Sequence, residues 1–133
     1  MTKRTKSKKV KKVKKIPGPL KGFTYQGRRV VLAFSRYANG QAIAIRLKTL
    51  GGELYATATV NLPNDIPAKD CVFIKDYSEN EGMLTWLVEN NIVITTGRVV
   101  FNKTLPSGFV TIPEARLLEP WLELFKVSEW VVA

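Results

Sequence analysis

Short stretches of alternating apolar and polar residues, separated by turn-forming pairs, place the strongest constraint on how this 133-residue chain folds. Residues 28–37, 41–49 and 53–61 alternate in this way, which is typical of strands with one buried face. The pairs Gln26-Gly27, Asn39-Gly40 and Gly51-Gly52 separate these runs, and such residues tolerate the backbone angles of tight hairpin turns. With residues 23–25 as a further strand, the sequence predicts an antiparallel β-meander.

The same alternation predicts which side chains share a face of each strand. In the first run Val30, Leu32 and Phe34 point one way, and in the second Ile43, Ile45 and Leu47 do so. In the third run the predicted shared face consists of Leu54, Ala56, Ala58 and Val60.

After a loop bracketed by Pro63 and Pro67, residues 71–74 read as a short buried strand in which Cys71 is a small apolar residue. A helix is expected over residues 79–89, because Ser78 and Glu81 have the spacing of a capping box. Its apolar face comprises Met83, Leu84, Leu87 and Val88, and Asn90-Asn91 supplies a left-handed stop.

Two more strands are expected at residues 92–101 and 109–118, around a turn that contains Pro106, Ser107 and Gly108. Residues 119–130 either form a short helix packed on the sheet, which we favour, or an exposed interaction segment that carries Trp121 and Trp130. The expected fold is therefore α+β: an antiparallel β-meander, one well-capped helix, a β-hairpin and a short C-terminal helix, in a single domain over residues 20–133.

The positive charge of the chain is concentrated at its N-terminus. The net charge is +10, yet residues 16–133 carry 12 basic and 11 acidic side chains. Residues 1–15 contain no acid, and we expect residues 1–19 to be a disordered tail that ends in the Pro17-Gly18-Pro19 linker. The nine cations of this tail are Lys3, Arg4, Lys6, Lys8, Lys9, Lys11, Lys12, Lys14 and Lys15.

A lysine-rich segment of this kind neutralises phosphates and releases counterions from DNA or RNA. No base-reading motif accompanies it, so the expected binding is not sequence-specific. A solubilising tail and a contact with anionic lipid are the alternatives. A weaker candidate for a stacking and phosphate surface consists of Arg28-Arg29 beside Tyr25, and of Tyr37 near Arg36. An ordinary solvated sheet face is the favoured interpretation of these residues.

Several classes of site are disfavoured by what the sequence lacks. The chain has no histidine and one cysteine, which argues against histidine-dependent triads and zinc sites. We expect no catalytic residues, metal or cofactor, although catalysis by carboxylates or lysine remains open. The sequence has neither a membrane-spanning run nor a secretory signal, so a cytoplasmic location is expected.

The most distinctive stretch is residues 76–82. Asp76, Glu79 and Glu81 lack the alternating ligands and central glycine of a calcium loop. Gly82 is costly inside a helix, and capping does not explain it. We therefore consider this stretch a possible docking surface for a protein partner, formed by Asp76, Tyr77, Glu79, Asn80 and Gly82.

Several segments occur in a familiar order: residues 37–40 with 42–47, 58–63, 74–84, and 107–110 with Pro113. In this order the chain resembles a family of short bacterial proteins of unknown function found on phages, plasmids and conjugative elements. The resemblance covers residues 23–118, and Ser78-Glu79-Asn80-Glu81-Gly82 is its most specific part. It implies a compact α+β domain in a mobile-element setting and carries no activity. The lysine-rich start departs from the family pattern.

Two functions remain open from the sequence. The first is a nucleic-acid-associated accessory protein whose tail binds phosphates. The second is a protein-binding module, for example an inhibitor of a host defence nuclease, whose tail accelerates encounter with the partner by electrostatic steering.

Overall fold

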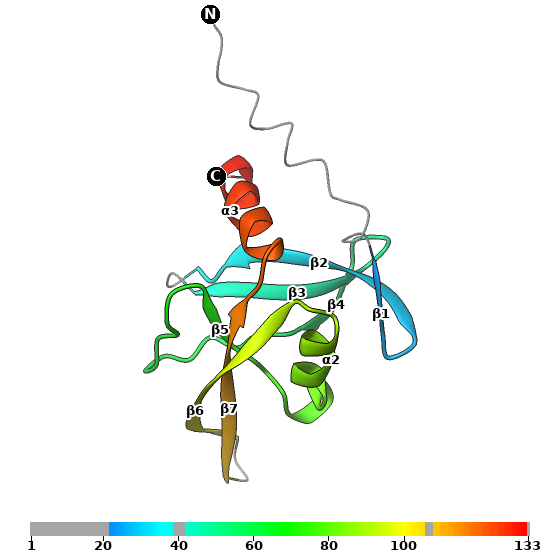
Figure 1. Cartoon of the computed structure of the whole chain (residues 1–133). Coiled ribbons are helices and arrows are strands. Elements are labelled where there is room, and N and C mark those ends of the chain that lie inside the picture. Colours follow the sequence, from blue (N-terminus) through cyan, green and yellow to red (C-terminus); the bar gives the residue numbers. More distant parts are fainter. Residues whose placement is uncertain (1–21, 39–41, 106–107, 133) are drawn as a thin grey trace, which may run out of the picture.

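The computed structural model describes residues 22–38, 42–105 and 108–132, together with the side chains of residues 22–38, 42–101 and 110–126. Its first four strands are β1 (Phe23–Tyr25), β2 (Arg28–Arg36), β3 (Ile43–Thr49) and β4 (Leu54–Thr57). They form one antiparallel sheet in the order β1-β2-β3-β4, which we call the first sheet. The predicted meander is confirmed (Figure 1).

The register of the first sheet brings the predicted apolar residues together on one face. Leu32 pairs with Leu47 and Phe34 pairs with Ile45, and all four contribute to the main core. Gln26 and Gly27 adopt φ angles of 52° and 78°, so both turn residues of the first hairpin are left-handed, as a tight turn requires. The Asn39-Gly40 turn lies outside the described residues.

A bulge between β3 and β4 reverses the predicted alternation at the start of β4. Leu47 pairs with Ala56, but Lys48 pairs with Leu54, so one additional residue, Tyr55, stands between the two pairs. Leu54 is consequently 58% exposed on the side of Lys48, whereas Ala56 and Ala58 retain their predicted orientation toward the core. The prediction that Leu54 shares a face with Ala56 and Ala58 is wrong, because the bulge shifts the alternation by one residue.

The second sheet contains β5 (Cys71–Phe73), β6 (Val93–Leu105) and β7 (Gly108–Leu117) in the order β5-β7-β6. The predicted buried strand and the predicted hairpin are both confirmed, and Cys71 is buried. Residues 58–60 connect the two sheets, because the Ala58 amide donates to Ile45 O and the Lys75 amide donates to Ala58 O, each at 2.8 Å. The two sheets thus enclose one main core.

The predicted capping box is wrong. Residues Ser78–Asn80 form a single 3-10 turn, η2, and the α-helix α2 comprises only Met83–Glu89. Gly82 is the N-cap of α2 and adopts a left-handed conformation. Glycine has no side chain that could accept a capping hydrogen bond. Asp76 performs this function from outside the helix, since its Oδ1 accepts a hydrogen bond from the Leu84 amide at 2.9 Å.

The other end of α2 agrees with the prediction. Asn91 adopts a left-handed φ of 58° directly after the C-cap Asn90, which stops the helix where the asparagine pair stands. The Ile92 amide then donates to Leu87 O at 2.9 Å and the chain enters β6.

The C-terminal helix α3 (Trp121–Val132) packs onto the protein by its first turns. Trp121, Leu122 and Phe125 are buried, and the Trp121 indole Nε1 donates to Asn91 O at 3.2 Å. Packing of this segment is therefore confirmed as far as Phe125, whereas the side chain of Trp130 lies outside the described part. The described helices include none that is long and apolar enough to cross a membrane.

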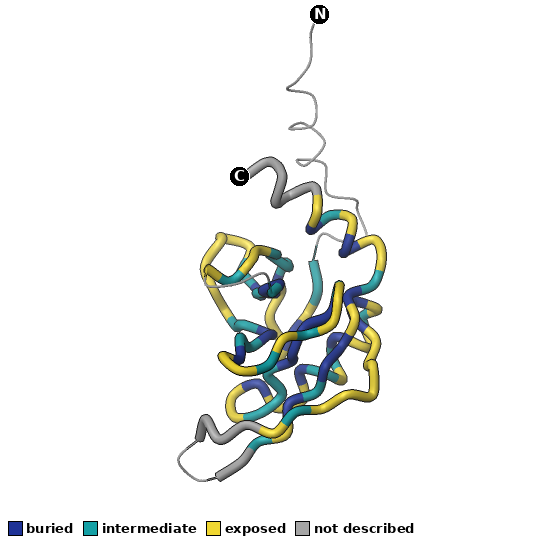
Figure 2. The backbone as a smooth tube through the Cα atoms, turned by 90° about the vertical axis from the view of Figure 1, so that its left-hand side faces the viewer, coloured by how far each residue is buried: buried dark blue, intermediate teal, exposed yellow. Residues whose placement is uncertain are grey.

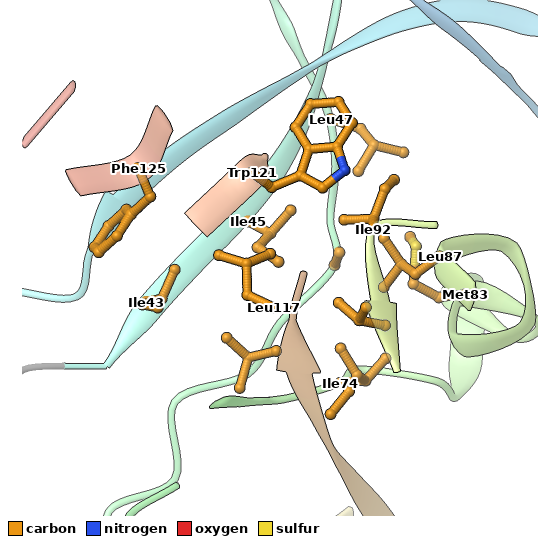
Figure 3. Close-up of a cluster of buried hydrophobic side chains, with 14 of the residues drawn as sticks. Ile43, Ile45, Leu47, Ile74, Met83, Leu87, Ile92, Leu117, Trp121 and Phe125 are labelled. Atoms are coloured by element: carbon orange, nitrogen blue, oxygen red, sulfur yellow. The ribbon is translucent and has the colours of Figure 1, made fainter. Parts of the chain in front are cut away.

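The main core joins residues from almost every element. In Figure 3 the side chains of Ile45 of β3, Leu87 of α2 and Trp121 of α3 lie around the same apolar centre. The buried backbone is concentrated between the two sheets, while the loops and outer edges are exposed (Figure 2).

Candidate nucleic-acid interface and neighbouring sites

The part of the protein that follows the lysine-rich segment, which we call the body (residues 22–133), has no net charge, but its positive and negative side chains are unevenly distributed along the chain. Residues 22–62, which contain the first sheet, carry five basic side chains and one acidic side chain, a net charge of +4. Residues 63–133 carry six basic and ten acidic side chains, a net charge of −4. The balance of the body conceals this division, because each half offsets the other. The five cations of the positive half are Arg28, Arg29, Arg36, Arg46 and Lys48.

Three of these five cations, Arg28, Arg36 and Arg46, lie against aromatic rings. The guanidinium carbon of Arg28 is 5.4 Å from the ring centroid of Tyr55, and that of Arg36 is 4.9 Å from the ring centroid of Phe125. Cation–π contacts at exposed sites contribute about 0.5–1 kcal/mol each. Arg28 therefore helps to hold β4 against the hairpin of β1 and β2, and Arg36 helps to hold α3 on the first sheet.

The tyrosines that were candidates for stacking on bases are engaged within the protein. Tyr25 is buried, and its ring lies edge-on to those of Trp86 and Tyr55, with centroids at 5.1 and 6.0 Å. Burial raises the pKa of the Tyr25 hydroxyl, and the neighbouring Tyr55, Asp76 and Glu79 raise it further. Tyr37 shares a 2.8 Å hydrogen bond with Thr59. These contacts leave Tyr25 and Tyr37 poorly placed to receive a base.

The structure gives internal contacts to most side chains of the predicted docking stretch. Asn80 is buried, 1% exposed, and its Nδ2 donates to Thr57 O at 2.6 Å, which fastens the stretch to β4. Asp76 caps α2. Tyr77 packs against the smaller core cluster around Phe73, and Lys75 Nζ lies 5.8 Å from its ring centroid.

Glu79 and Gly82 are the exposed members of that stretch. Lys75 Nζ is 2.6 Å from Glu79 Oε2, and this hydrogen bond lowers the pKa of Glu79. Gly82 has a φ of 94°, and no atom lies within 4 Å of the point that a Cβ would occupy, so the turn geometry, and not a close neighbour, favours glycine there. Among the described residues, no group of three or more acidic or cysteine side chains could hold a metal ion.

A cleft of about 600 Å³ lies between the loop of residues 61–70, the paired end of β2 and start of β3, and α3. Cys71 lines it, and burial raises the pKa of this thiol, which favours its protonated form. Sequence reasoning did not find this cleft, because its walls come from three segments that are far apart in the chain. Its charged lining residues, of both signs, are Arg36, Asp65, Lys69, Asp70 and Lys126.

The predicted nucleic-acid-binding residues, Lys3 to Lys15, lie outside the described residues. Their covalent attachment is nevertheless informative, since Gly22, the first described residue, directly precedes β1 of the positive half.

Comparison with protein families gives one match. The model of DUF4313, a domain of unknown function, matches residues 31–125, which is 95 of the 133 residues. The chain belongs to the DUF4313 family. The DUF4313 match begins within β2 and ends at Phe125 of α3, so it contains β3 to β7 and α2 in full. The lysine-rich segment, β1 and Arg29 precede it. No curated protein and no solved structure matches the chain.

Proposed function

We propose that this protein is a non-enzymatic, nucleic-acid-associated accessory protein that binds DNA or RNA without sequence specificity through its lysine-rich residues. The observation that carries the proposal is the presence of nine cations and no acid in residues 1–15. Lysines on flexible stems act as point charges that follow phosphates in many geometries. Such a segment needs no fixed structure to bind a polyanion.

The remaining composition is consistent with a binding role. The chain has no histidine, and its single thiol is buried, so the commonest general base and nucleophile are absent or covered. The resemblance to proteins of phages, plasmids and conjugative elements supports a mobile-element setting, in which access to cytoplasmic nucleic acid is expected.

The proposal makes a quantitative prediction about salt. With six to nine phosphate contacts, a plot of log K against log salt concentration has a slope of about −5 to −8 for duplex DNA. A variant with Lys8, Lys9, Lys11, Lys12 and Lys14 replaced by glutamine should lower the steepness of this slope by about 4 to 5. The matched control replaces the same five lysines with arginine, which preserves the charge.

Fluorescence anisotropy of a labelled duplex measures the affinity and its dependence on salt concentration. We expect the glutamine variant to bind much more weakly than the wild type and the arginine variant to bind at least as well. Equal affinity and slope for the wild type and the glutamine variant would contradict the proposal, as would a wild type that does not bind at about 0.1 M salt.

The negative half of the body supports a second candidate, a protein-binding module such as an inhibitor of a host nuclease. Its net charge of −4 and the exposed Glu79 and Glu81 suit a basic partner surface. Neutralising both residues with glutamine should weaken capture of such a partner from nuclease-treated host lysate. The control is neutralisation of Glu89 and Glu123, which are also exposed. Asn80 is unsuitable for this test, because its side chain is buried.

A further inference from the structure

Three cations project from the face of the first sheet that points away from the core. Along β2, Arg29, Val31 and Ala33 alternate with the core residues, so they share this outer face. Val31 pairs with Lys48 and Ala33 pairs with Arg46, and directly paired residues of antiparallel strands lie on the same face. Arg29, Arg46 and Lys48 therefore stand together on two adjacent strands.

The surface between these cations is low and carries no opposing charge. Val31 and Ala33 are small, half-buried side chains, so nothing bulky separates the cations of β2 from those of β3. The strands β1 to β4 contain no acidic residue, and the one acid of residues 22–62 is Glu53 in the turn between β3 and β4. Arg46 is oriented by a 2.9 Å hydrogen bond from its Nη1 to Ser35 Oγ and by the Tyr37 ring 5.7 Å away.

The chemistry of this face suits phosphates better than unpaired bases. Single-stranded nucleic acid is bound by stacking of its bases on exposed aromatic rings. On this outer face the ring of Tyr37 is beside the Arg46 guanidinium and its hydroxyl is hydrogen-bonded to Thr59. The face thus offers fixed charges beside a ring that is already engaged, which favours the phosphate backbone of a duplex over unpaired bases.

The described structure begins at Gly22, beside this face. The Arg29 guanidinium lies close to Gly22, the residue before β1: a Cβ added to Gly22 would be 2.8 Å from Arg29 Nη2. Asn80 holds the acidic stretch of residues 76–81 at β4, and its Asp76 and Glu79 lie near Tyr25, whose side chain belongs to the core and not to the outer face. A polyanion is consequently attracted toward the outer face, which carries Arg29, Arg46 and Lys48, and away from the acidic stretch.

We infer that the outer face of the first sheet docks the phosphate backbone of double-stranded nucleic acid, through Arg29, Arg46 and Lys48, and that it acts together with the lysine-rich segment. This inference rests on the proposed function and adds a defined contact surface on the folded body. It replaces the expectation from sequence that the segment alone carries the attraction to polyanions.

The test uses the full-length chain with Arg29, Arg46 and Lys48 replaced by glutamine. Each lost phosphate contact reduces the steepness of the salt dependence by about 0.9, so three substitutions should reduce it by about 2.7. At about 0.1 M salt we expect the affinity for a labelled 20-base-pair duplex to fall by at least about tenfold. The matched control replaces three exposed cations elsewhere, Lys69, Arg116 and Lys126, and should leave the slope within about 0.5 of the wild type.

The result that overturns the inference is an unchanged slope in the sheet variant, or an equal loss in the sheet and control variants. Either result leaves the proposed function intact if neutralising the lysine-rich segment still abolishes binding. Equal or tighter binding of a single strand of the same sequence, or of anionic phosphatidylserine vesicles, also overturns it. Should the triple variant not fold, as judged by its thermal melting, the pair Arg29→Gln and Lys48→Gln retains the Arg46 contacts and should reduce the slope by about 1.8.

Discussion

The Nη1 atom of Arg98 in β6 lies 2.9 Å from Oε2 of Glu114 in β7, and both side chains also bind backbone atoms of the loop of residues 61–70. Glu114 is 3% exposed, and its carboxylate also accepts hydrogen bonds from the Ala68 amide and from Thr96 Oγ1, at 2.9 and 2.7 Å. Arg98 Nη1 donates in addition to Ile66 O at 3.1 Å. One buried carboxylate thus positions a wall of the cleft.

Replacing Glu114 with glutamine should lower the free energy of unfolding by about 2 kcal/mol, the range for hydrogen bonds to charged groups. Most of the loss should come from the weaker hydrogen bonds of the Ala68 amide and Thr96 hydroxyl to the buried group, because Arg98 is 42% exposed and can be hydrated. Urea denaturation measures this change. The exposed Glu89→Gln is the control and should change stability by less than about 0.5 kcal/mol. Equal effects of the two substitutions would argue against a structural role of the buried carboxylate.

The same carboxylate should make stability depend on pH in acid. Burial raises the pKa of Glu114, but the hydrogen bonds from Thr96, Ala68 and Arg98 outweigh burial, and the pKa lies below its ordinary value. The unfolded chain therefore takes up this proton at a higher pH than the folded protein does. The contribution of Glu114 is complete above the ordinary glutamate pKa of about 4.3 and is lost as the pH falls through the lower folded value. The difference in the free energy of unfolding between about pH 7 and about pH 3, measured by denaturation, should be smaller for Glu114→Gln than for the wild type.

The strand pattern could be predicted from the sequence because alternation and turn chemistry are local. Gln26-Gly27 adopts the expected left-handed angles, and Leu32 and Leu47 face the core together. The bulge at Tyr55 could not be read in this way, since Leu54 and Ala56 fit the alternation equally well. Only the pairing with β3 decides which of them is buried.

The candidate site was less accessible to sequence reasoning, because it depends on which residues meet in space. Ser78 and Glu81 have the spacing of a capping box, yet Asp76, farther along the chain from α2, caps the helix. Arg29 and Lys48 share one face because Val31 pairs with Lys48, which follows from strand register and not from proximity in the sequence. The charge difference between the halves is present in the sequence, but its meaning depends on the first sheet being formed by one of them.

Two substitutions distinguish the observed cap of α2 from the expected one. Asp76→Ala removes the acceptor for the Leu84 amide and should lower the free energy of unfolding by about 1 kcal/mol. Asp76→Asn retains an acceptor oxygen and should lower it less. Ser78→Ala should change it by less than about 0.5 kcal/mol, because the Ser78 side chain does not cap α2. A larger loss for Ser78→Ala than for Asp76→Ala, measured by thermal or urea denaturation, would contradict this assignment.

For Gly82→Ala, the expected and the observed helix boundaries predict changes of opposite sign in the free energy of unfolding. If Gly82 were inside a helix, alanine would raise the free energy of unfolding by about 1 kcal/mol through its higher helix propensity. Gly82 instead has a φ of 94°, and an alanine in left-handed conformation costs about 1–2 kcal/mol. No atom lies within 4 Å of the added Cβ, so the expected destabilisation arises from the backbone and not from a steric clash. Thr85→Ala, at an exposed position within α2, is the control and should stabilise slightly; a gain in stability for Gly82→Ala of similar size would show that the chain is helical at residue 82.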